Sequence, residues 1–406
     1  MKLDFLELKN IGGDFVNIEN ALNAPKSYFG RHLPAVSVSK LTDGAKYHIT
    51  SYLNGLRLFV VPDKLAARNA VEKLNGMKQD CAVYISERDD TLLNAKNISQ
   101  VSMSERLNAL SRLIDGKAEV AVITAEGLLQ KYPSTELFSK LQTKLAVDYE
   151  IPPQTLADKL ARAGYRRVDT VSEEGEFALR GDIFDIYPMG RQNPVRINFF
   201  DDFVESIKQF ELASMTSACD YSEITIAPAS DILVDEKSLR EIAEKSGDNQ
   251  MPPQAQSIYR ELAESVTVGA CTAELVWLRP FLSSAQSSIF DYFNENAVIV
   301  FDEPKVVWEK LDLCQKEHKS RVTTLLSAGE IAPIHSNAIF TTDSILKRLE
   351  TFRLLSLSSL NISNPLFKPT AVFSPNSRPV TKYYLDTAAL IADLRVYLLN
   401  GFKVVL

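Results

Sequence analysis

The first candidate for chemistry is a lysine, Lys46, in a segment spaced like a phosphate-binding loop. Such loops follow Gly-x-x-x-x-Gly-Lys-[Ser/Thr], where glycines let the backbone wrap the phosphates and the hydroxyl binds Mg²⁺. Here Lys40 and Ala45 replace the two glycines, and Tyr47 replaces the hydroxyl residue. The Cβ of Ala45 would crowd the phosphates, and a phenol cannot act as the metal ligand. The segment therefore predicts a degenerate nucleotide site.

A second piece of such a site is the pair Asp302 and Glu303, which ends the apolar run that begins at residue 297. In nucleotide hydrolases a strand of this kind presents an aspartate to Mg²⁺ and a glutamate to the attacking water. The simpler interpretation is a strand followed by a turn with two exposed acids. Lys46 and the two acids together are more specific than either piece, yet without glycines we expect no ATP hydrolysis by this chain.

The elements around these residues indicate an α/β domain whose first part is residues 1–131. Continuous apolar runs predict buried parallel strands, and amphipathic segments between them predict helices, with Asp63 as a helix N-cap. Alternation of this kind gives a parallel sheet with helices on its faces. The expected strands are residues 56–61, 81–86 and 118–125, and the expected helices are residues 63–76 and 102–116.

The pattern changes at residues 132–230, where short strands separated by turns predict an inserted α+β antiparallel module. Val195, Ile197 and Phe199 alternate with polar residues, as in a half-buried strand. Glu174-Gly175 and Asp201-Asp202 are the expected hairpin turns. The module therefore interrupts the parallel-sheet domain.

The expected second part of the parallel-sheet domain is residues 231–350, and residues 351–406 are expected to be a linker and the start of a small α/β domain. The proline-rich stretch at residues 361–379 suggests that last boundary. The sequence stops within an apolar strand, so we expect it to be the front piece of a longer protein.

Composition narrows the function further. Lys and Arg total 45 against 52 Asp and Glu, a net charge of −7, which disfavours a protein that grips nucleic acid through its whole surface. The four cysteines lack zinc-site spacing, and their free thiols fit a cytoplasmic location. Neither a signal peptide nor a membrane-spanning run is visible in the sequence, so no membrane partner and no metal site are expected.

Several segments carry a resemblance to a known family. LTDGAKYHITSYLNGLRLFVVPDKLAARNAVEKL, GEFALRGDIFDIYPMG with VRINFFDDFVESI, and DYFNENAVIVFDEP resemble the N-terminal part of bacterial transcription-repair coupling factors, which is itself similar to the excision-repair protein UvrB. The resemblance covers residues from about 40 to 310. It implies a degenerate helicase-like (RecA-like) domain split by an inserted module. It also implies later domains that bind RNA polymerase and double-stranded DNA and that use ATP and Mg²⁺.

The resemblance also implies a partner for the module. In the family this module binds UvrA through arginines near the start of the meander and beside the Arg-Gly turn. Arg167 and Arg180 match those positions, Arg166 is a register alternative, and Phe184 is the expected apolar anchor. Ala178 stands where UvrB has a further arginine.

Three functions follow as hypotheses. The preferred one is a regulatory scaffold that presents the module to UvrA and so recruits excision repair to stalled RNA polymerase, without a cofactor of its own. An active ATP-dependent DNA helicase would need the lost phosphate-binding loop. A UvrB-like damage verifier would need an aromatic hairpin, and residues 87–103 contain no aromatic residue.

Overall fold

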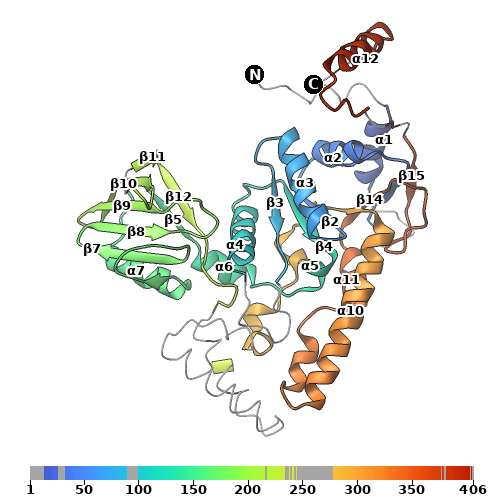
Figure 1. Cartoon of the computed structure of the whole chain (residues 1–406). Coiled ribbons are helices and arrows are strands. Elements are labelled where there is room, and N and C mark those ends of the chain that lie inside the picture. Colours follow the sequence, from blue (N-terminus) through green and yellow to red (C-terminus); the bar gives the residue numbers. More distant parts are fainter. Residues whose placement is uncertain are drawn as a thin grey trace.

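The computed structural model describes residues 13–25, 33–88, 99–214, 217–233, 278–375, 377–378, 381–402 and 404, with the isolated residues 237, 240, 241 and 244. Its largest element is a seven-stranded, wholly parallel sheet in the order β15-β1-β14-β13-β2-β4-β3 (Figure 1). The strands are β1 (Ala35–Val38), β2 (Arg57–Val61), β3 (Ala82–Ile85), β4 (Val120–Thr124), β13 (Val298–Asp302), β14 (Arg353–Leu357) and β15 (Ala371–Phe373).

Helices cover both faces of this sheet, so its central strands are buried on both sides. One face packs on α1 (Gly13–Leu22), α2 (Asp43–Tyr52) and α3 (Lys64–Met77). The other packs on α4 (Gln100–Ile114), α5 (Ala125–Leu129), α10 (Pro304–Ser327) and α11 (Thr342–Leu349). Every residue of β2, β4 and β13 is buried, which explains why these strands are continuous apolar runs in the sequence.

Local signals set the helix ends much as the sequence predicts. The side chain of Asp63 accepts a hydrogen bond from the Ala66 N–H at 3.0 Å and caps α3. The C-terminal end differs from expectation, because α3 continues through Gly76 to Met77. Leu74 is buried, whereas Leu65 is 80% exposed, since it lies on the outer side of the first helical turn.

The inserted module is a mainly antiparallel sheet packed on one helix, which confirms the predicted fold class. Its six strands run in the order β11-β10-β9-β8-β7-β6, and a two-stranded sheet, β12-β5, lies beside them. Helix α7 (Pro153–Arg162) covers the inner face through Leu156 and Leu160. The strands are β5 (Thr143–Ala146), β6 (Arg166–Arg167), β7 (Glu176–Arg180), β8 (Ile183–Tyr187), β9 (Val195–Phe200), β10 (Phe203–Phe210), β11 (Ser217–Tyr221) and β12 (Glu223–Ile226).

One of the two predicted hairpin turns is wrong. Asp201-Asp202 joins β9 to β10 as expected, with Phe200 paired to Phe203. Glu174-Gly175 does not join antiparallel strands, because β6 and β7 run parallel. Gly175 has φ +87° and leads the chain from a loop into β7, so its backbone freedom serves a loop rather than a hairpin. The turn between β7 and β8 is Gly181-Asp182.

The chain after residue 350 also differs from expectation. Strands β14 and β15 belong to the large parallel sheet, β14 lying between β1 and β13 and β15 beside β1. The stretch expected to be only a linker thus includes β15. Helix α12 (Thr387–Leu399) follows, with no buried residue. Residues 89–98, within the segment that a damage verifier would need as an aromatic hairpin, lie outside the described residues, as do most of residues 234–277 and most of the last apolar strand.

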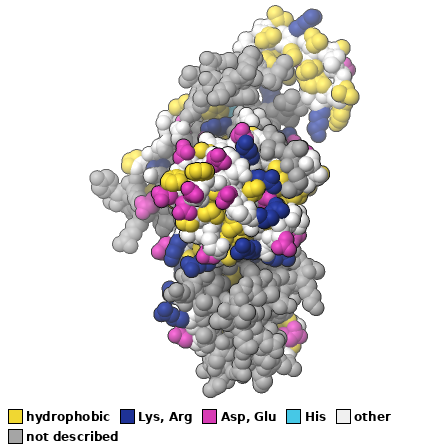
Figure 2. Space-filling view, turned by 90° about the vertical axis from the view of Figure 1, so that its left-hand side faces the viewer, with side chains coloured by type: hydrophobic (Ala, Val, Ile, Leu, Met, Phe, Trp, Pro, Cys, Tyr) yellow, Lys and Arg dark blue, Asp and Glu magenta, His cyan; other side chains and the backbone are white. Residues whose placement is uncertain are grey.

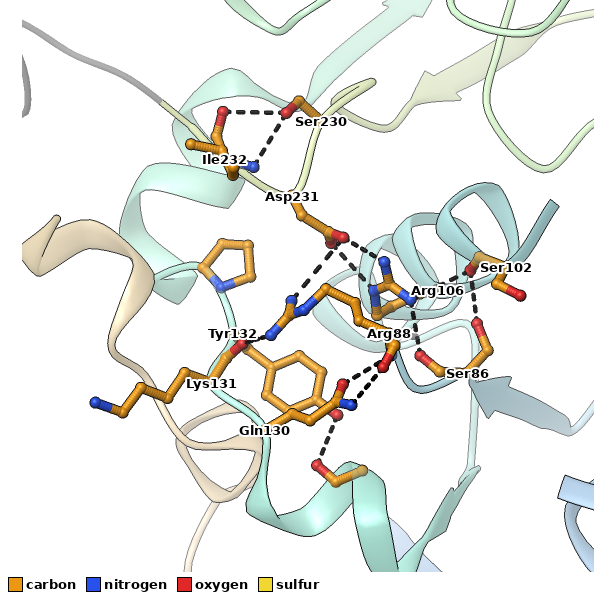
Figure 3. A network of polar contacts seen from close by, with 12 residues as sticks. Ser86, Arg88, Ser102, Arg106, Gln130, Lys131, Tyr132, Ser230, Asp231 and Ile232 are labelled. Carbon is orange, nitrogen blue, oxygen red and sulfur yellow. Dashed lines mark hydrogen bonds and ion pairs between the residues drawn. The ribbon is translucent and has the colours of Figure 1, made fainter. Parts of the chain in front are cut away.

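A buried polar network fastens the module to the parallel-sheet domain (Figure 3). Asp231, where the chain leaves the module, pairs with Arg106 of α4, whose Nε lies 3.2 Å from its Oδ1. Arg88 approaches the same carboxylate at 3.9 Å, and its guanidinium lies over the ring of Tyr132 at the module's entry. Gln130 exchanges two hydrogen bonds with the backbone of Arg88. Both crossings of the chain are therefore held by one cluster.

The charge of Asp231 is essential to that cluster. Burial alone would raise the pKa of this carboxyl, but the neighbouring arginines outweigh burial and lower the pKa to about 2. The carboxylate therefore stays ionised at all ordinary pH values.

Among the described residues, no helix has both the length and the apolar character required to cross a bilayer.

Candidate functional site

The structure brings together the three residues of the predicted nucleotide site. Lys46 lies on α2, which follows β1, while Asp302 and Glu303 lie at the end of β13 and directly after it. The carboxyl ends of parallel strands meet at one edge of the sheet. The Lys46 Nζ lies 2.7 Å from Asp302 Oδ1 and 2.6 Å from Glu303 Oε1. Lys46 is only 4% exposed, so its ammonium group is enclosed between two carboxylates.

The electrostatics of this triad (Lys46, Asp302 and Glu303) keep its charges in place. Burial opposes the charge of Lys46, but Asp302 and then Glu303 outweigh burial and raise the lysine pKa above its ordinary value. Burial likewise opposes ionisation of Glu303, yet hydrogen bonds from Lys46 and Ser359 lower its pKa. Ser359, just after β14, donates to Glu303 from its N–H at 2.8 Å and from its hydroxyl at 2.7 Å.

The loop that would cradle phosphates uses its backbone N–H groups internally. The N–H of Ser39 donates to the carbonyl of Phe373, and the N–H of Leu41 donates to the carbonyl of Ser358. The N–H of Thr42 donates to the hydroxyl of Ser377 at 3.0 Å. The Ser377 hydroxyl in turn donates to the carbonyl of Lys40, which has φ +61°. Ser358, Phe373 and Ser377 therefore occupy three of the backbone donors of this loop.

The residue in the metal-binding position points away from this edge. Tyr47 is buried, packs on Phe59 with ring centroids 6.0 Å apart, and accepts a hydrogen bond from the Asn69 amide at 3.3 Å. It is therefore part of the core on the α2–α3 face of the sheet. Across the part of the chain that the structure describes, no group of three or more His, Cys, Asp or Glu side chains is arranged to hold a metal ion.

The module carries the predicted partner-binding residues, and the structure separates the two register alternatives. Arg166 is bound within the module, because its guanidinium pairs with Glu173 at 2.7 Å and Glu176 at 2.6 Å. Glu176 is almost fully buried and also accepts from the N–H and hydroxyl of Ser172. Arg166 thus neutralises a buried carboxylate at the start of β7.

Arg167 and Arg180 lie together instead. With Val168, Asp169 and Leu179 they line a hollow of about 610 Å³ where β6 ends beside β7. Arg180 is 52% exposed and donates to Asp185 at 3.1 Å. Arg167 is exposed, and no ion pair joins it to any other residue within the described ranges. The hollow therefore presents two guanidinium groups, one of which retains its full set of donors.

The predicted apolar anchor is wrong. Phe184 is fully buried, stacked on Phe177 with ring centroids 5.4 Å apart and in edge contact with Phe199. Strand alternation is the reason, because Phe184 shares the inner face of β8 with Ile186 and packs beneath α7. Its neighbour Ile183 points outward and is 39% exposed.

Some structural residues of these sites had no sequence signal. Asp185 is 1% exposed and is held by Arg196, whose Nε and Nη2 donate to its two oxygens at 2.7 and 2.9 Å. The only hint was an acid at an interior strand position. Ser359 and Ser377 lie in irregular segments, where periodicity carries no information. Their roles emerge only from the folded chain.

Comparison with known proteins extends these observations. Residues 143–231 match the UvrB interaction domain family, which corresponds to the inserted module. Over a larger part of its length the chain is similar to transcription-repair-coupling factors, and the resemblance seen in the sequence is confirmed. The protein of Bacillus subtilis (strain 168) is 27% identical over 287 residues, which cover 68% of this chain. That of Staphylococcus aureus (strain bovine RF122 / ET3-1) is 26% identical over 313 residues, or 75% of this chain.

The chain spans about a quarter of the length of these curated relatives, 24% and 26% respectively. Activities of the remaining three quarters are therefore not properties of the residues described above.

Proposed function

We propose that this chain is the UvrA-recruiting region of a transcription-repair coupling factor and that it acts by binding rather than by catalysis. The observation that carries the proposal is the arginine hollow formed by Arg167 and Arg180 within the module that matches the UvrB interaction domain. Arginine suits this role because its planar fork pairs with carboxylates through two hydrogen bonds. The expected contact on UvrA is therefore an acidic surface.

The parallel-sheet domain supports this role as a scaffold. The triad offers no charge for a phosphate, because Lys46 is neutralised by Asp302 and Glu303 at hydrogen-bonding distance. Its loop N–H groups are likewise engaged by the chain itself. We infer that this chain hydrolyses no ATP. Translocation on double-stranded DNA, contact with RNA polymerase, and use of ATP with Mg²⁺ are proposed for the rest of a full-length protein acting in the cytoplasm.

The binding test uses the purified chain, UvrA and biolayer interferometry. The double variant Arg167→Ala with Arg180→Ala should weaken binding by at least about tenfold, the effect of losing roughly 1.4 kcal/mol. Arg162→Ala, an exposed arginine at the end of α7, is the matched control and should bind as the wild type does. Wild-type-like binding by the double variant would reject the hollow as the contact.

Two further measurements separate the alternatives. Arg166→Ala should retain UvrA binding, since Arg166 serves Glu176; loss of binding by a folded Arg166→Ala protein would support the other register. A steady-state phosphate-release assay with Mg²⁺ and ATP should show no turnover by this chain. Sustained hydrolysis, abolished by Lys46→Ala, would instead support an active helicase.

A further inference from the structure

The free end of the module carries an apolar patch that its fold does not require. At the turn between β9 and β10, Phe200 is 69% exposed and Phe203 is 46% exposed, and the two residues are cross-strand partners. Ile183 of β8 is the diagonal neighbour of Phe200 of β9. It pairs with Asn198, which precedes Phe200 by two residues and lies on the same face of the sheet. We call Ile183, Phe200 and Phe203 the tip patch.

Packing within the module does not explain the tip patch. The core is filled from the other face of the same strands, by Phe199 and Val204, which are almost fully buried. Polar residues would complete this hairpin equally well, since its Asp201-Asp202 turn already sets the register. Adjacent exposed aromatic rings are typical of surfaces that another molecule covers.

Acidic side chains lie around Phe200 and Phe203, whereas on the other side of the tip patch Ile183 pairs with Arg180 of β7. Glu150 forms a backbone bridge with Phe203, and the two turns at this end contribute further carboxylates. No ion pair joins these acids to another residue in the described ranges. All are exposed, namely Asp182, Asp201, Asp202, Glu205 and Glu150. Figure 2 shows hydrophobic side chains lying among both acidic and basic ones on the face turned to the viewer.

We propose that the tip patch is a docking surface for a basic, apolar protein segment, adjacent to the arginine hollow but formed by other residues. Charge complementarity selects this occupant, because the carboxylates around Phe200 and Phe203 repel nucleic acid and anionic surfaces. The same carboxylates disfavour a second copy of this chain, since a symmetric contact would bring two groups of acids together. The occupant inserts an apolar side chain beside Phe200 and Phe203 and places lysines or arginines against the acids.

The experiment measures fluorescence anisotropy of labelled peptides titrated with the whole chain. The probe is a ten-residue peptide of alternating lysine and leucine, compared with a lysine–serine and a glutamate–leucine peptide. We expect saturable binding of the lysine–leucine peptide only. Phe200→Ser with Phe203→Ser should weaken it by at least about tenfold. Asp201→Asn with Asp202→Asn should weaken it several-fold and reduce its salt dependence.

Matched variants locate the binding. Leu65→Ser with Leu360→Ser removes two exposed leucines elsewhere, and this double variant should bind as the wild type does. Arg167→Ala, which leaves Arg180 in place beside Ile183, should also bind normally, and this separates the tip patch from the proposed UvrA contact. Equal binding of the lysine–serine peptide, or normal binding by a folded Phe200→Ser, Phe203→Ser protein, would overturn the proposal. So would a concentration-dependent dimer that the Phe200→Ser, Phe203→Ser variant abolishes.

Discussion

The triad and the arginine hollow both set basic side chains beside carboxylates, but they differ in what remains for a ligand. Lys46 is enclosed, with both neighbouring acids at hydrogen-bonding distance. In the hollow, Asp185 already has two donors from Arg196, so Arg180 adds a single bond and stays half exposed. A basic residue therefore indicates a binding site only when the carboxylates of its own chain leave part of its charge and its hydrogen-bond donors unpaired.

The difference also separates stability from function. Removing one member of a buried ion cluster leaves an uncompensated charge and costs stability. Removing an exposed, loosely paired arginine costs little stability but removes a contact for a partner. The following substitutions test this contrast, ordered from the largest expected loss of stability to the smallest.

Lys46→Ala should have the largest effect, lowering the free energy of unfolding by about 3–5 kcal/mol because the buried Asp302 and the partly buried Glu303 lose their counter-charge. Urea denaturation followed by circular dichroism would measure it. Lys305→Ala, which removes an exposed lysine at the start of α10, is the matched control and should change stability by less than about 0.5 kcal/mol. Equal effects of the two variants would show that the triad is not a structural element.

Arg196→Ala should come next. It removes both strong donors to the buried carboxylate of Asp185 and the guanidinium that lies 4.9 Å from the ring centroid of Phe210. Hydrogen bonds to charged groups contribute about 1.5–3 kcal/mol, and Arg180 remains as a weaker partner, so we expect a loss of about 2–3 kcal/mol. Urea denaturation measures the loss. A stability change no larger than that of Arg180→Ala would contradict the assigned order of the two arginines.

These two sites show how far the sequence could lead. The meeting of Lys46 with Asp302 and Glu303 was predictable, because parallel strands bring their carboxyl ends to one edge. The hydrogen bonds that Ser359 and Ser377 make around this site were not predictable, since both serines lie in irregular segments whose path depends on tertiary packing. The parallel sheet and the antiparallel module were also predictable, from apolar runs and period-two alternation.

The errors have equally specific causes. Phe184 was assigned to the surface by analogy, whereas alternation with Ile186 places both residues on the inner face of β8. Glu174-Gly175 had hairpin-like composition, but a glycine with positive φ serves loops as well as hairpins. Proline content suggested a boundary after residue 360, yet the prolines flank β15, an edge strand in which they remove no interior hydrogen bond.

The pH dependence of Glu303→Gln tests the charge of the triad. The pKa of Glu303 is lowered in the folded chain, so its ionisation stabilises the fold above its ordinary pKa of 4.5. That stabilisation is lost as the pH falls through the lowered value. We therefore expect the stability difference between wild type and Glu303→Gln to be constant near pH 7 and to shrink below about pH 4.5. A carboxyl whose pKa falls by one pH unit on folding contributes about 1.4 kcal/mol in its ionised form.

The same triad should respond at alkaline pH in the opposite sense. The pKa of Lys46 is raised, so its contribution is complete below its ordinary pKa of 10.5 and is lost as the pH rises through the raised value. Denaturation curves of the wild type and of Glu303→Gln from about pH 3 to pH 11 would measure the changes in stability at acid and at alkaline pH. A difference that is unchanged below about pH 4.5 would contradict the assignment of an ionised Glu303.

Ser377→Ala should have a smaller effect, because it removes one hydroxyl that forms hydrogen bonds with the backbone of the degenerate loop. The Thr42 N–H and the Lys40 carbonyl each lose a partner, but both lie near solvent, so we expect a loss of about 1 kcal/mol. Thermal unfolding monitored by fluorescence would measure this loss. Thr381→Ala, in the same connecting segment, is the control. A similar loss for both variants would show that the hydrogen bonds of Ser377 make no specific contribution to stability.

Arg167→Ala should have the smallest effect on stability and the clearest effect on binding. Its side chain is exposed on a two-residue edge strand, so the free energy of unfolding should change by less than about 0.5 kcal/mol. Binding to UvrA should fall severalfold, because the hollow loses the guanidinium that retains all its donors. A variant that unfolds more easily while binding UvrA normally would show that Arg167, like Lys46, stabilises the fold and does not contact the partner. The proposed difference between the triad and the arginine hollow would then be wrong.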